Sequence, residues 1–322
     1  MTTYNYNSEL IKAMNEKLPN GTNLANTLID MLYLGKEAVY RRLRGEVPFT
    51  LAEAAAISQK MGVSLDKLAG TNADSNAIFD LNIIRQTDPL ETYYSIVDNY
   101  VKIFRDLNRD PSSELCTSSN MIPQTFYLKY ELLSKFRMFK WIYQFEKINI
   151  EKHFEDIEIV DKLLEKQREF VRESQEFGYT EYIWDNKLFI YLINDIKYFA
   201  SVHLISQEYV QKLKKELLQL LDELEEIATR GTFRTGQGVC IYISNINFEA
   251  TYSYIASPAY HISLVRVFAI NSFATRDEQV FNSVKEWIHS LKKFSTLISQ
   301  SGEMQRVKFF KTQREIVEGL CV

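Results

Sequence analysis

Gly35-Lys-Glu-Ala-Val-Tyr-Arg-Arg-Leu-Arg-Gly45 is the stretch of this 322-residue chain in which polar and apolar positions separate most clearly. In a helix with 3.6 residues per turn, one side carries Glu37, Tyr40, Arg41 and Arg44. Val39 and Leu43 fall on the opposite side. The pattern therefore predicts a short helix that packs through its apolar side and presents a largely cationic side outward.

The neighbouring residues predict a compact bundle of helices around this one. An apolar-periodic helix, Asn23-Leu-Ala-Asn-Thr-Leu-Ile-Asp-Met31, precedes it and is separated from it by the short turn Leu32-Tyr-Leu-Gly35. This is the spacing of a helix-turn-helix. Thr50-Leu-Ala-Glu53 is a capping box that begins the next helix, and Gly62-Val-Ser-Leu-Asp-Lys-Leu68 gives a stop and a last short helix.

These residues resemble the Xre/Cro-like family of helix-turn-helix repressors, and most closely its BetR-like variant. The family pattern is matched at Leu24-Ala25, from Ala38 to Glu46 and from Gly62 to Leu68, within residues 20–70 only. At Gly35 the chain departs from it, because glycine stands where a capping serine is usual. The resemblance implies a lambda-repressor-like bundle over residues 1–70 that binds double-stranded DNA. It places the recognition helix at residues 36–44 in the major groove, with DNA contacts from Lys36, Glu37, Tyr40, Arg41, Arg42 and Arg44.

A purely structural interpretation of the same residues stays open. Basic amphipathic helices are often solvated surfaces, and some helix-turn-helix folds make only protein contacts. Arg42 lies to the side of the stripe, where a salt bridge to Glu46 or Glu53 is the alternative. The chain would then be a helical protein that binds a peptide or a protein partner and does not read DNA.

Composition and charge agree with a folded, cytoplasmic regulator. The net charge is −4, but residues 1–70 carry 8 basic against 7 acidic side chains, which leaves 30 against 35 for residues 71–322. Binding to phosphate depends on the cations near the DNA backbone, so a local basic surface is sufficient. Cys116, Cys240 and Cys321 lie far apart, which favours a reduced compartment. We expect neither a leader peptide nor a membrane span.

The remainder of the chain is expected to be mostly helical. Residues 71–88 have the composition of a linker, and residues 89–230 predict a helical domain whose first helix begins near Pro89. Residues 108–120 read as a loop. Further helices are predicted over residues 122–145, which are rich in aromatic side chains, and over residues 151–176, 181–202 and 207–229.

Two features of this part bear on assembly and sensing. Val210, Leu213, Leu217, Leu220, Leu224 and Ile227 form a stripe that suits either a helix packed into the core or a dimer seam. The aromatic side chains between Phe126 and Phe145 suit either a core or an effector pocket.

Residues 231–322 predict a small antiparallel sheet with helices, for sensing or dimerisation. Strands are expected over residues 239–244, 250–256 and 260–270, and a capping box at Thr275-Arg-Asp-Glu278 is expected to begin a helix. A last helix is expected from Gln305 to Leu320. The predicted fold class is therefore mainly α with a small antiparallel β-sheet near the C-terminus (α+β).

No pattern in the sequence indicates an enzyme. The four histidines are scattered, and Gly231 to Gly238 precedes a strand and lacks the lysine of a phosphate-binding loop. We therefore expect no catalytic residues, no metal site and no cofactor. The expected function is that of a sequence-specific transcriptional regulator that binds double-stranded DNA as a homodimer. No pattern in the sequence identifies the operator or shows whether the protein activates or represses transcription. The identity of any peptide or small-molecule effector is also not given by the sequence.

Overall fold

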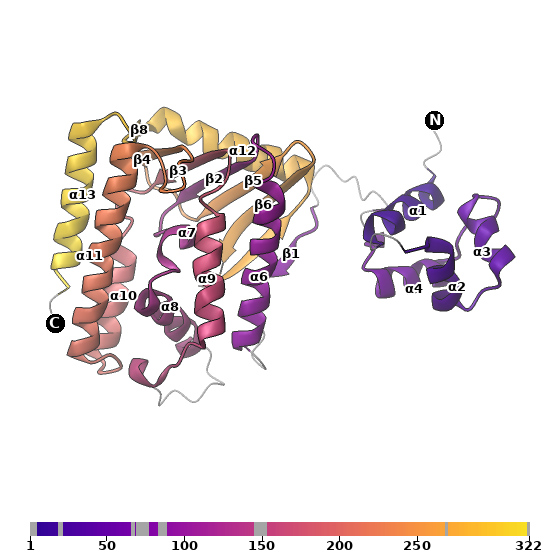
Figure 1. The fold of residues 1–322 in the computed structure, drawn as a ribbon, viewed down its shortest axis with the longest axis horizontal. Helices are drawn as coiled ribbons and strands as arrows, with labels where there is room; N and C mark the ends of the chain where they lie inside the picture. Colours follow the sequence, from indigo (N-terminus) through magenta and orange to yellow (C-terminus); the bar gives the residue numbers. More distant parts are fainter. Residues whose placement is uncertain are drawn as a thin grey trace. The chain divides into compact units, whose positions relative to one another are not determined.

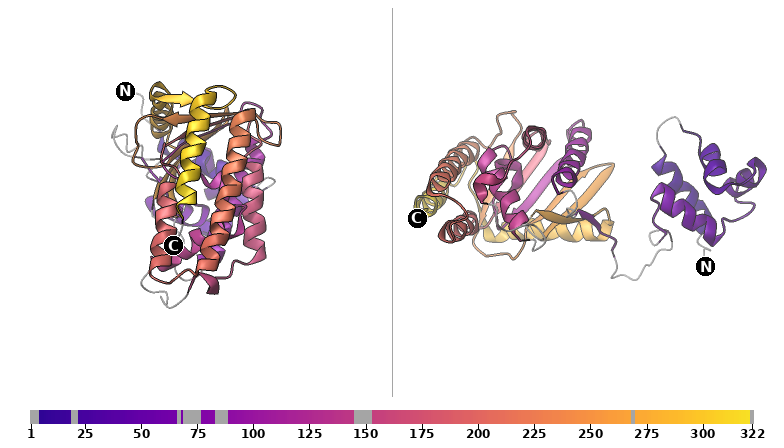
Figure 2. Two further views of the ribbon diagram at one scale, coloured as in Figure 1. Left: turned by 90° about the vertical axis from the view of Figure 1, so that its left-hand side faces the viewer. Right: turned by 90° about the horizontal axis from the view of Figure 1, so that it is seen from below.

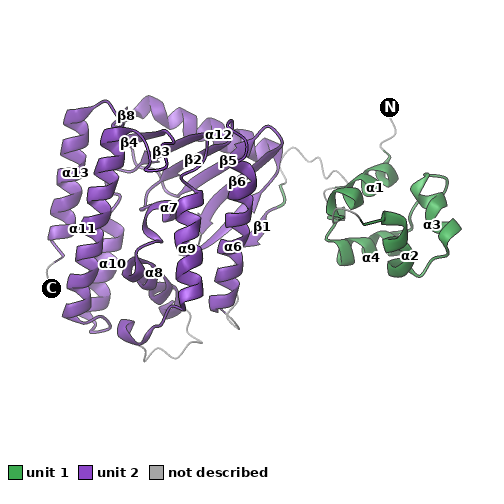
Figure 3. Cartoon of the chain, viewed as in Figure 1, with its two compact units in different colours: residues 1–78 green, residues 79–322 purple. Residues whose placement is uncertain are grey.

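The chain forms two compact units in a computed structural model, Met1–Ile78 and Phe79–Val322 (Figure 3). The structure describes residues 5–18, 22–65, 68, 77–82, 89–144, 153–267 and 270–320. The expected linker at residues 71–88 lies mostly outside the described residues, as does part of the expected short helix that ends at Leu68. Each unit is described by itself below.

The first unit is a bundle of short helices around a small apolar core. Its helices are α1 (Tyr6–Lys17), α2 (Leu24–Leu32), α3 (Lys36–Leu43) and α4 (Leu51–Met61) (Figure 1). Each of them contributes to the core, which is built from Leu10, Met14, Ala25, Leu28, Val39, Ile57 and Val63.

Local caps fix where these helices begin and end. The Asn23 side chain accepts hydrogen bonds from Ala25 N and Asn26 N, which begins α2. The predicted capping box is confirmed, because Thr50 Oγ1 accepts from Glu53 N (3.2 Å) and Glu53 Oε2 accepts from Thr50 N (2.8 Å). Gly62 ends α4 in the left-handed conformation that glycine adopts without a steric penalty.

The second unit is organised by one eight-stranded mixed sheet in the order β1-β7-β6-β5-β2-β3-β4-β8. The strands are β1 (Asp80–Asn82), β2 (Glu114–Ser119), β3 (Tyr179–Trp184), β4 (Val239–Ser244), β5 (Tyr252–Ser257), β6 (Tyr260–Val267), β7 (Asn271–Thr275) and β8 (Ser295–Leu297). Strands β2, β3 and β4 are parallel, and every other pairing is antiparallel.

Helices cover the two faces of this sheet unequally (Figure 2). One face carries α12 (Glu278–Leu291), which packs Val284, Ile288 and Leu291 onto β2, β3 and β5. The larger core lies between the other face and the remaining helices. These are α6 (Pro89–Leu107), α7 (Gln124–Tyr127), α8 (Glu131–Tyr143), α9 (Asp161–Glu173), α10 (Ile190–Ser201), α11 (Gln207–Arg230) and α13 (Glu303–Glu318), with short 3-10 turns η1 (Phe154–Asp156) and η2 (Lys292–Phe294) elsewhere.

The predicted fold class is wrong about the sheet. It was expected to be small, antiparallel and confined to the C-terminal part, whereas it is mixed, has eight strands and runs through the unit from Asp80 to Leu297. The fold is α+β. Strand β2 lies where a loop was expected at residues 108–120, and β3 overlaps the start of the helix expected at residues 181–202. An apolar stripe from Phe281 to Ile298 predicts that the helix expected after Thr275 continues to the end of that stripe, but β8 occupies Ser295–Leu297 within it.

Polar partners from distant strands explain why β2 was not recognised. Thr117 Oγ1 and Ser253 Oγ are 2.9 Å apart, and Ser119 Oγ lies 3.2 Å from Thr251 Oγ1. These hydroxyls belong to a buried strand because their hydrogen bonds cross to a segment more than a hundred residues later. Local β-propensity carries no information about such partners.

Several single elements confirm or refine the sequence predictions. Helix α6 begins at Pro89 as predicted. The stripe from Val210 to Ile227 is buried in the core of its own unit, so it is a core-facing helix and offers no dimer seam. Helix α12 begins at Glu278 with Asp277 as its N-cap, two residues after the expected cap at Thr275. Among the described residues, no helix combines the length and apolar character needed to cross a membrane.

Candidate nucleic-acid interface

Helix α3 separates a packing side from a solvent side at the positions that the sequence indicates. Val39 is fully buried in the core of the first unit, and Leu43 packs against that core. Lys36, Glu37, Arg41 and Arg44 are exposed, and Tyr40 is half-buried. Gly35 is the N-cap and offers no side chain to cap the helix, so the first amide groups of α3 are open to an acceptor from outside.

Arg42 is held by the bundle. Its Nη2 lies 2.7 Å from Glu53 Oε1 and its Nε donates to Glu53 Oε2 at 2.9 Å, while Nη1 donates to the Ala38 carbonyl oxygen at 3.1 Å. Burial raises the pKa of Glu53, but the hydrogen bonds from Arg42 and Thr50 outweigh it and hold that pKa below its ordinary value. Because this two-pronged pair ties α3 to α4, Arg42 takes the structural role that was its alternative.

Arg41 and Arg44 are engaged by acidic side chains of their own neighbourhood. Arg44 Nε donates to Glu46 Oε1 at 2.6 Å, and its Nη2 donates to Glu37 Oε1 at 3.1 Å. Arg41 Nε lies 3.5 Å from Glu46 Oε2. The hydrogen bond with Arg44 lowers the pKa of Glu46, and the nearby charge of Arg41 adds to this effect. All four side chains are exposed, so these ion pairs are weak and can be exchanged for a stronger anion.

The turn before α3 adds an aromatic residue that the sequence interpretation did not assign to the interface. Tyr33 ends α2 with φ 54°, and its side chain is 88% exposed. A tyrosine in this left-handed conformation is unusual, since glycine or asparagine is the common choice. Lys60 Nζ lies 5.6 Å above its ring. The sequence signal was available, because the position directly after α2 holds Tyr33 where glycine or asparagine would be the common choice.

Lys36, Arg41 and Arg44 are exposed on α3, Tyr40 is half-buried beside them, and Tyr33 is exposed in the turn before the helix. Arg41 and Arg44 supply forked donors, and Lys36 supplies a compact cation whose Nζ lies 6.0 Å above the Tyr40 ring. Guanidinium groups pair with guanine edges or with phosphates, and open amides at a helix N-terminus bind phosphate. We call Tyr33, Lys36, Tyr40, Arg41 and Arg44 the reading surface.

No protein-family model matches the chain, and neither a curated protein nor a solved structure matches it.

Within the described ranges, no group of three or more His, Cys, Asp or Glu side chains could hold a metal ion. Cys116 and Cys240 are free thiols, and burial raises the pKa of both.

Proposed function

We propose that the protein is a cytoplasmic, sequence-specific transcriptional regulator that inserts α3 into the major groove of double-stranded DNA. One observation carries the proposal: Arg41 and Arg44 are exposed on the side of α3 opposite to the buried Val39, within a helix-turn-helix bundle. A helix presented in this way fits the width of the major groove. Glu37 and Glu46 would be displaced from the arginines by phosphates or by base edges.

The first test measures binding to DNA directly. Double-stranded oligonucleotides selected from a random pool by the full chain should share a motif, and mobility shifts should give the affinity for that motif. Arg41→Ala and Arg44→Ala should each lose about 1–3 kcal/mol of specific binding, the range for a good base contact. Lys12→Ala is the matched control, because Lys12 is an exposed cation on α1.

Two outcomes would contradict this assignment. If the selected oligonucleotides shared no motif, the protein would not bind DNA in a sequence-specific way. If both arginine variants bound DNA with unchanged affinity and were folded by circular dichroism, the exposed side of α3 would not be the DNA-binding surface.

A protein-binding role is the second candidate, and the ion pairs on α3 favour it. Each arginine of the reading surface already has a carboxylate partner. The charges of these arginines are therefore balanced in the free protein, as is common on surfaces that contact other proteins. Saturable binding of a protein partner that Arg41→Ala abolishes, without a salt-dependent affinity for DNA, would support this candidate instead.

We further propose that the regulator works as a homodimer. A single helix-turn-helix reads a short site, and two-fold pairing places half-sites about 34 Å apart. With the stripe of α11 buried, the remaining predicted seam is the sheet face that carries α12. Trp287 on α12 and Phe294 on η2 are 45% and 52% exposed there.

A further inference from the structure

Two arginines without an acidic partner meet inside the second unit. Arg137 on α8 is 8% exposed. Arg266 on β6 is half-buried, and strand alternation puts it on the same face of the sheet as Ile262 and Leu264, which face the larger core. Among the described residues, neither guanidinium forms an ion pair with Asp or Glu. An arginine at an apolar-face position of a predicted strand was a sequence signal for this site.

A single neutral side chain takes the place where an anion would be expected. With the Gln124 amide oriented so that its oxygen faces the arginines, that oxygen accepts from Arg137 Nη1 at 2.8 Å and from Arg266 Nη1 at 2.5 Å. Arg137 Nη1 also donates to Tyr127 Oη. A carboxamide oxygen carries only a partial charge, so it leaves both positive charges uncompensated.

The surroundings of the pair retain unused hydrogen-bonding capacity. Burial, followed by the charge of Arg137, lowers the pKa of Arg266 to about 10, against the opposing effect of nearby phenols. In the described part of the chain, Arg137 Nε is a buried polar atom without a hydrogen-bond partner, whereas Tyr93 and Gln167 lie close enough to share a hydrogen bond. Native proteins rarely leave a buried donor such as Arg137 Nε unpaired, so it calls for a ligand, an ion or a water.

A cavity of about 110 Å³ opens beside Gln124 and Arg266. Its floor is formed by β2, β5, β6 and β7, and its roof by α6 and Phe170 of α9. Most of the wall is apolar, with Val97, Phe104, Leu115, Ile255, Leu264 and Ile270 among its residues. Thr117 and Ser253 in the floor hydrogen-bond to each other, and Arg266 and Gln124 bring a guanidinium and an amide to the same cavity. Arg137 lines a neighbouring cavity that Arg266 also lines, so the two cavities meet at the arginine pair.

We propose that the second unit binds a small carboxylic acid, with its carboxylate between Arg137 and Arg266 and its apolar body in the cavity beneath α6. A carboxylate is planar and has nearly the shape of the Gln124 amide, so it can replace that amide at the guanidiniums and supply the missing charge. An apolar cavity of about 150 Å³ accepts a benzene ring, so the body of this ligand is about one ring or a short aliphatic chain in size. The site lies within residues 79–322 and does not depend on the assignment of DNA binding.

The first test supplies the missing charge from the chain itself. Gln124→Glu places a carboxylate of almost the same shape beside both arginines and should raise the melting temperature of the full chain by at least about 2 °C. Gln211→Glu, at an exposed position on α11, is the matched control and should leave it unchanged. If Gln124→Glu lowers the melting temperature or leaves it unchanged, no uncompensated positive pair exists and the proposal fails.

The second test measures binding of defined probes by calorimetry on the full chain. Phenylacetate and hexanoate should bind saturably, whereas the neutral phenylacetamide should not. Arg266→Met should weaken phenylacetate binding by about ten- to a hundredfold, and Gln124→Glu should abolish it. Absence of saturable binding by both acids would overturn the ligand assignment even if Gln124→Glu is stabilising. Tighter binding of phenyl phosphate than of phenylacetate would replace the carboxylate by a phosphate ester and also overturn it.

Discussion

Glu46 shows how one acidic residue can tune a basic surface. It pairs with Arg44 at 2.6 Å and approaches Arg41 at 3.5 Å, so it partly neutralises the two strongest donors of the reading surface. Exposed pairs of this kind contribute little to the stability of the fold. Their main effect is on the electrostatic potential around the exposed side of α3.

Glu46→Gln should therefore strengthen binding to DNA of any sequence. With one more arginine free for phosphate, the slope of log affinity against log salt should steepen by about 0.9. The measurement is fluorescence anisotropy with a random-sequence duplex over a salt series. Glu16→Gln, an exposed acid on α1, is the control. An unchanged or shallower slope for Glu46→Gln would show that the arginines do not meet phosphates.

Residue identity predicted the exposed side of α3 because its signals are local. The alternation of Val39 and Leu43 with Lys36, Tyr40, Arg41 and Arg44 lies within a few turns of one helix. The fate of Arg42 needed the structure, because two acceptors, Glu46 and Glu53, were within reach and only the packing of α4 selects Glu53. Arg266 itself gave a signal, as an arginine at an apolar-face position of a predicted strand, but its proximity to Arg137 was hidden for the same reason, since Arg137 lies on another element.

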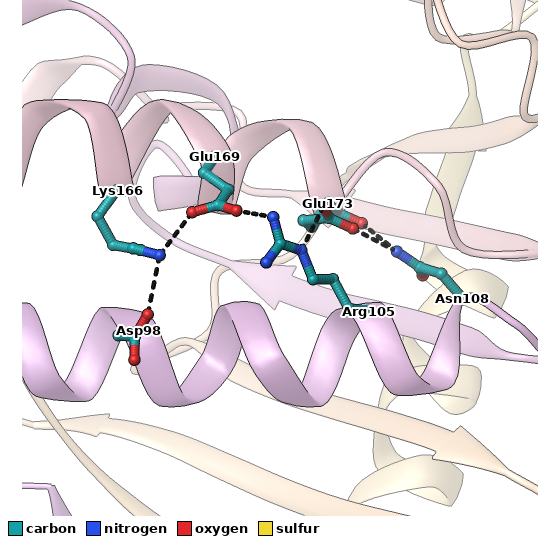
Figure 4. A network of polar contacts seen from close by, with 6 residues as sticks. All are labelled: Asp98, Arg105, Asn108, Lys166, Glu169 and Glu173. Atoms are coloured by element: carbon teal, nitrogen blue, oxygen red, sulfur yellow. Dashed lines mark hydrogen bonds and ion pairs between the residues drawn. The ribbon is translucent and has the colours of Figure 1, made fainter.

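Helices α6 and α9, which contribute the roof of the proposed ligand site, are joined by a chain of ion pairs (Figure 4). Lys166 Nζ lies 2.8 Å from Asp98 and 2.7 Å from Glu169. Arg105 pairs with Glu169 and, at 3.0 Å, with Glu173, which also accepts a hydrogen bond from Asn108. Charges from both helices alternate along the network, so it fixes the register of α6 against α9.

Asp98 makes this network sensitive to acid. Hydrogen bonds from Lys102 and then Lys166 lower its pKa to about 2, against an ordinary value of about 3.9. A depressed carboxyl pKa contributes stability above the unfolded-state value, and this contribution is lost as the pH falls through the folded-state value. Asp98→Asn should therefore lower the free energy of unfolding of the second unit by about 1 kcal/mol at neutral pH. The difference in unfolding free energy between the variant and wild type should vanish as the pH falls from about 4 to about 2.

Tryptophan fluorescence during urea unfolding measures this prediction selectively, because Trp141, Trp184 and Trp287 all belong to the second unit. Asp106→Asn serves as the control, since Asp106 forms an exposed pair with Arg109. If Asp98→Asn lowered the free energy of unfolding by the same amount at pH 7 and near pH 2, the effect would not come from the charge of Asp98.

Elements were predictable where their pattern is amphipathic and local. Helix α11 follows its apolar stripe, and β4, β5 and β6 follow their β-branched and aromatic residues. Strand β3 could not be found in this way, because Glu181 at its centre is fully buried. Its carboxylate is held by Lys292 and Tyr179, each at 2.5 Å, and Lys292 lies more than a hundred residues away.

Across the whole second unit, the sheet face with α12 is the less covered one. Trp287 and Phe294 are exposed beside it, and Ile246 follows Asn245, whose backbone N–H donates to the Phe294 carbonyl oxygen at 2.8 Å. Exposed apolar side chains such as these three are of the kind that subunit contacts cover.

Trp287→Glu should convert the proposed dimer into a monomer, because a charge in an apolar interface is not compensated. Light scattering should give twice the 37.7 kDa chain mass for wild type and the single mass for the variant. Tyr198→Glu, on α10 and 58% exposed, should leave the dimer intact. If the wild-type chain were monomeric at micromolar concentration, both with and without operator DNA, the homodimer proposal would be wrong.

The pairing of β1 with β7 determines how late the sheet of the second unit can be completed while the chain is synthesised on the ribosome. Asn82 reaches its partner Ser272 across 190 residues of chain, and β2 must also wait for β5 before the middle of the sheet can close. The bundle of residues 1–78 has its own core and needs no later segment. The helix-turn-helix can therefore fold while the unit that would bind the acid is still an open set of strands. Nascent chains that terminate early would release this bundle without the second unit.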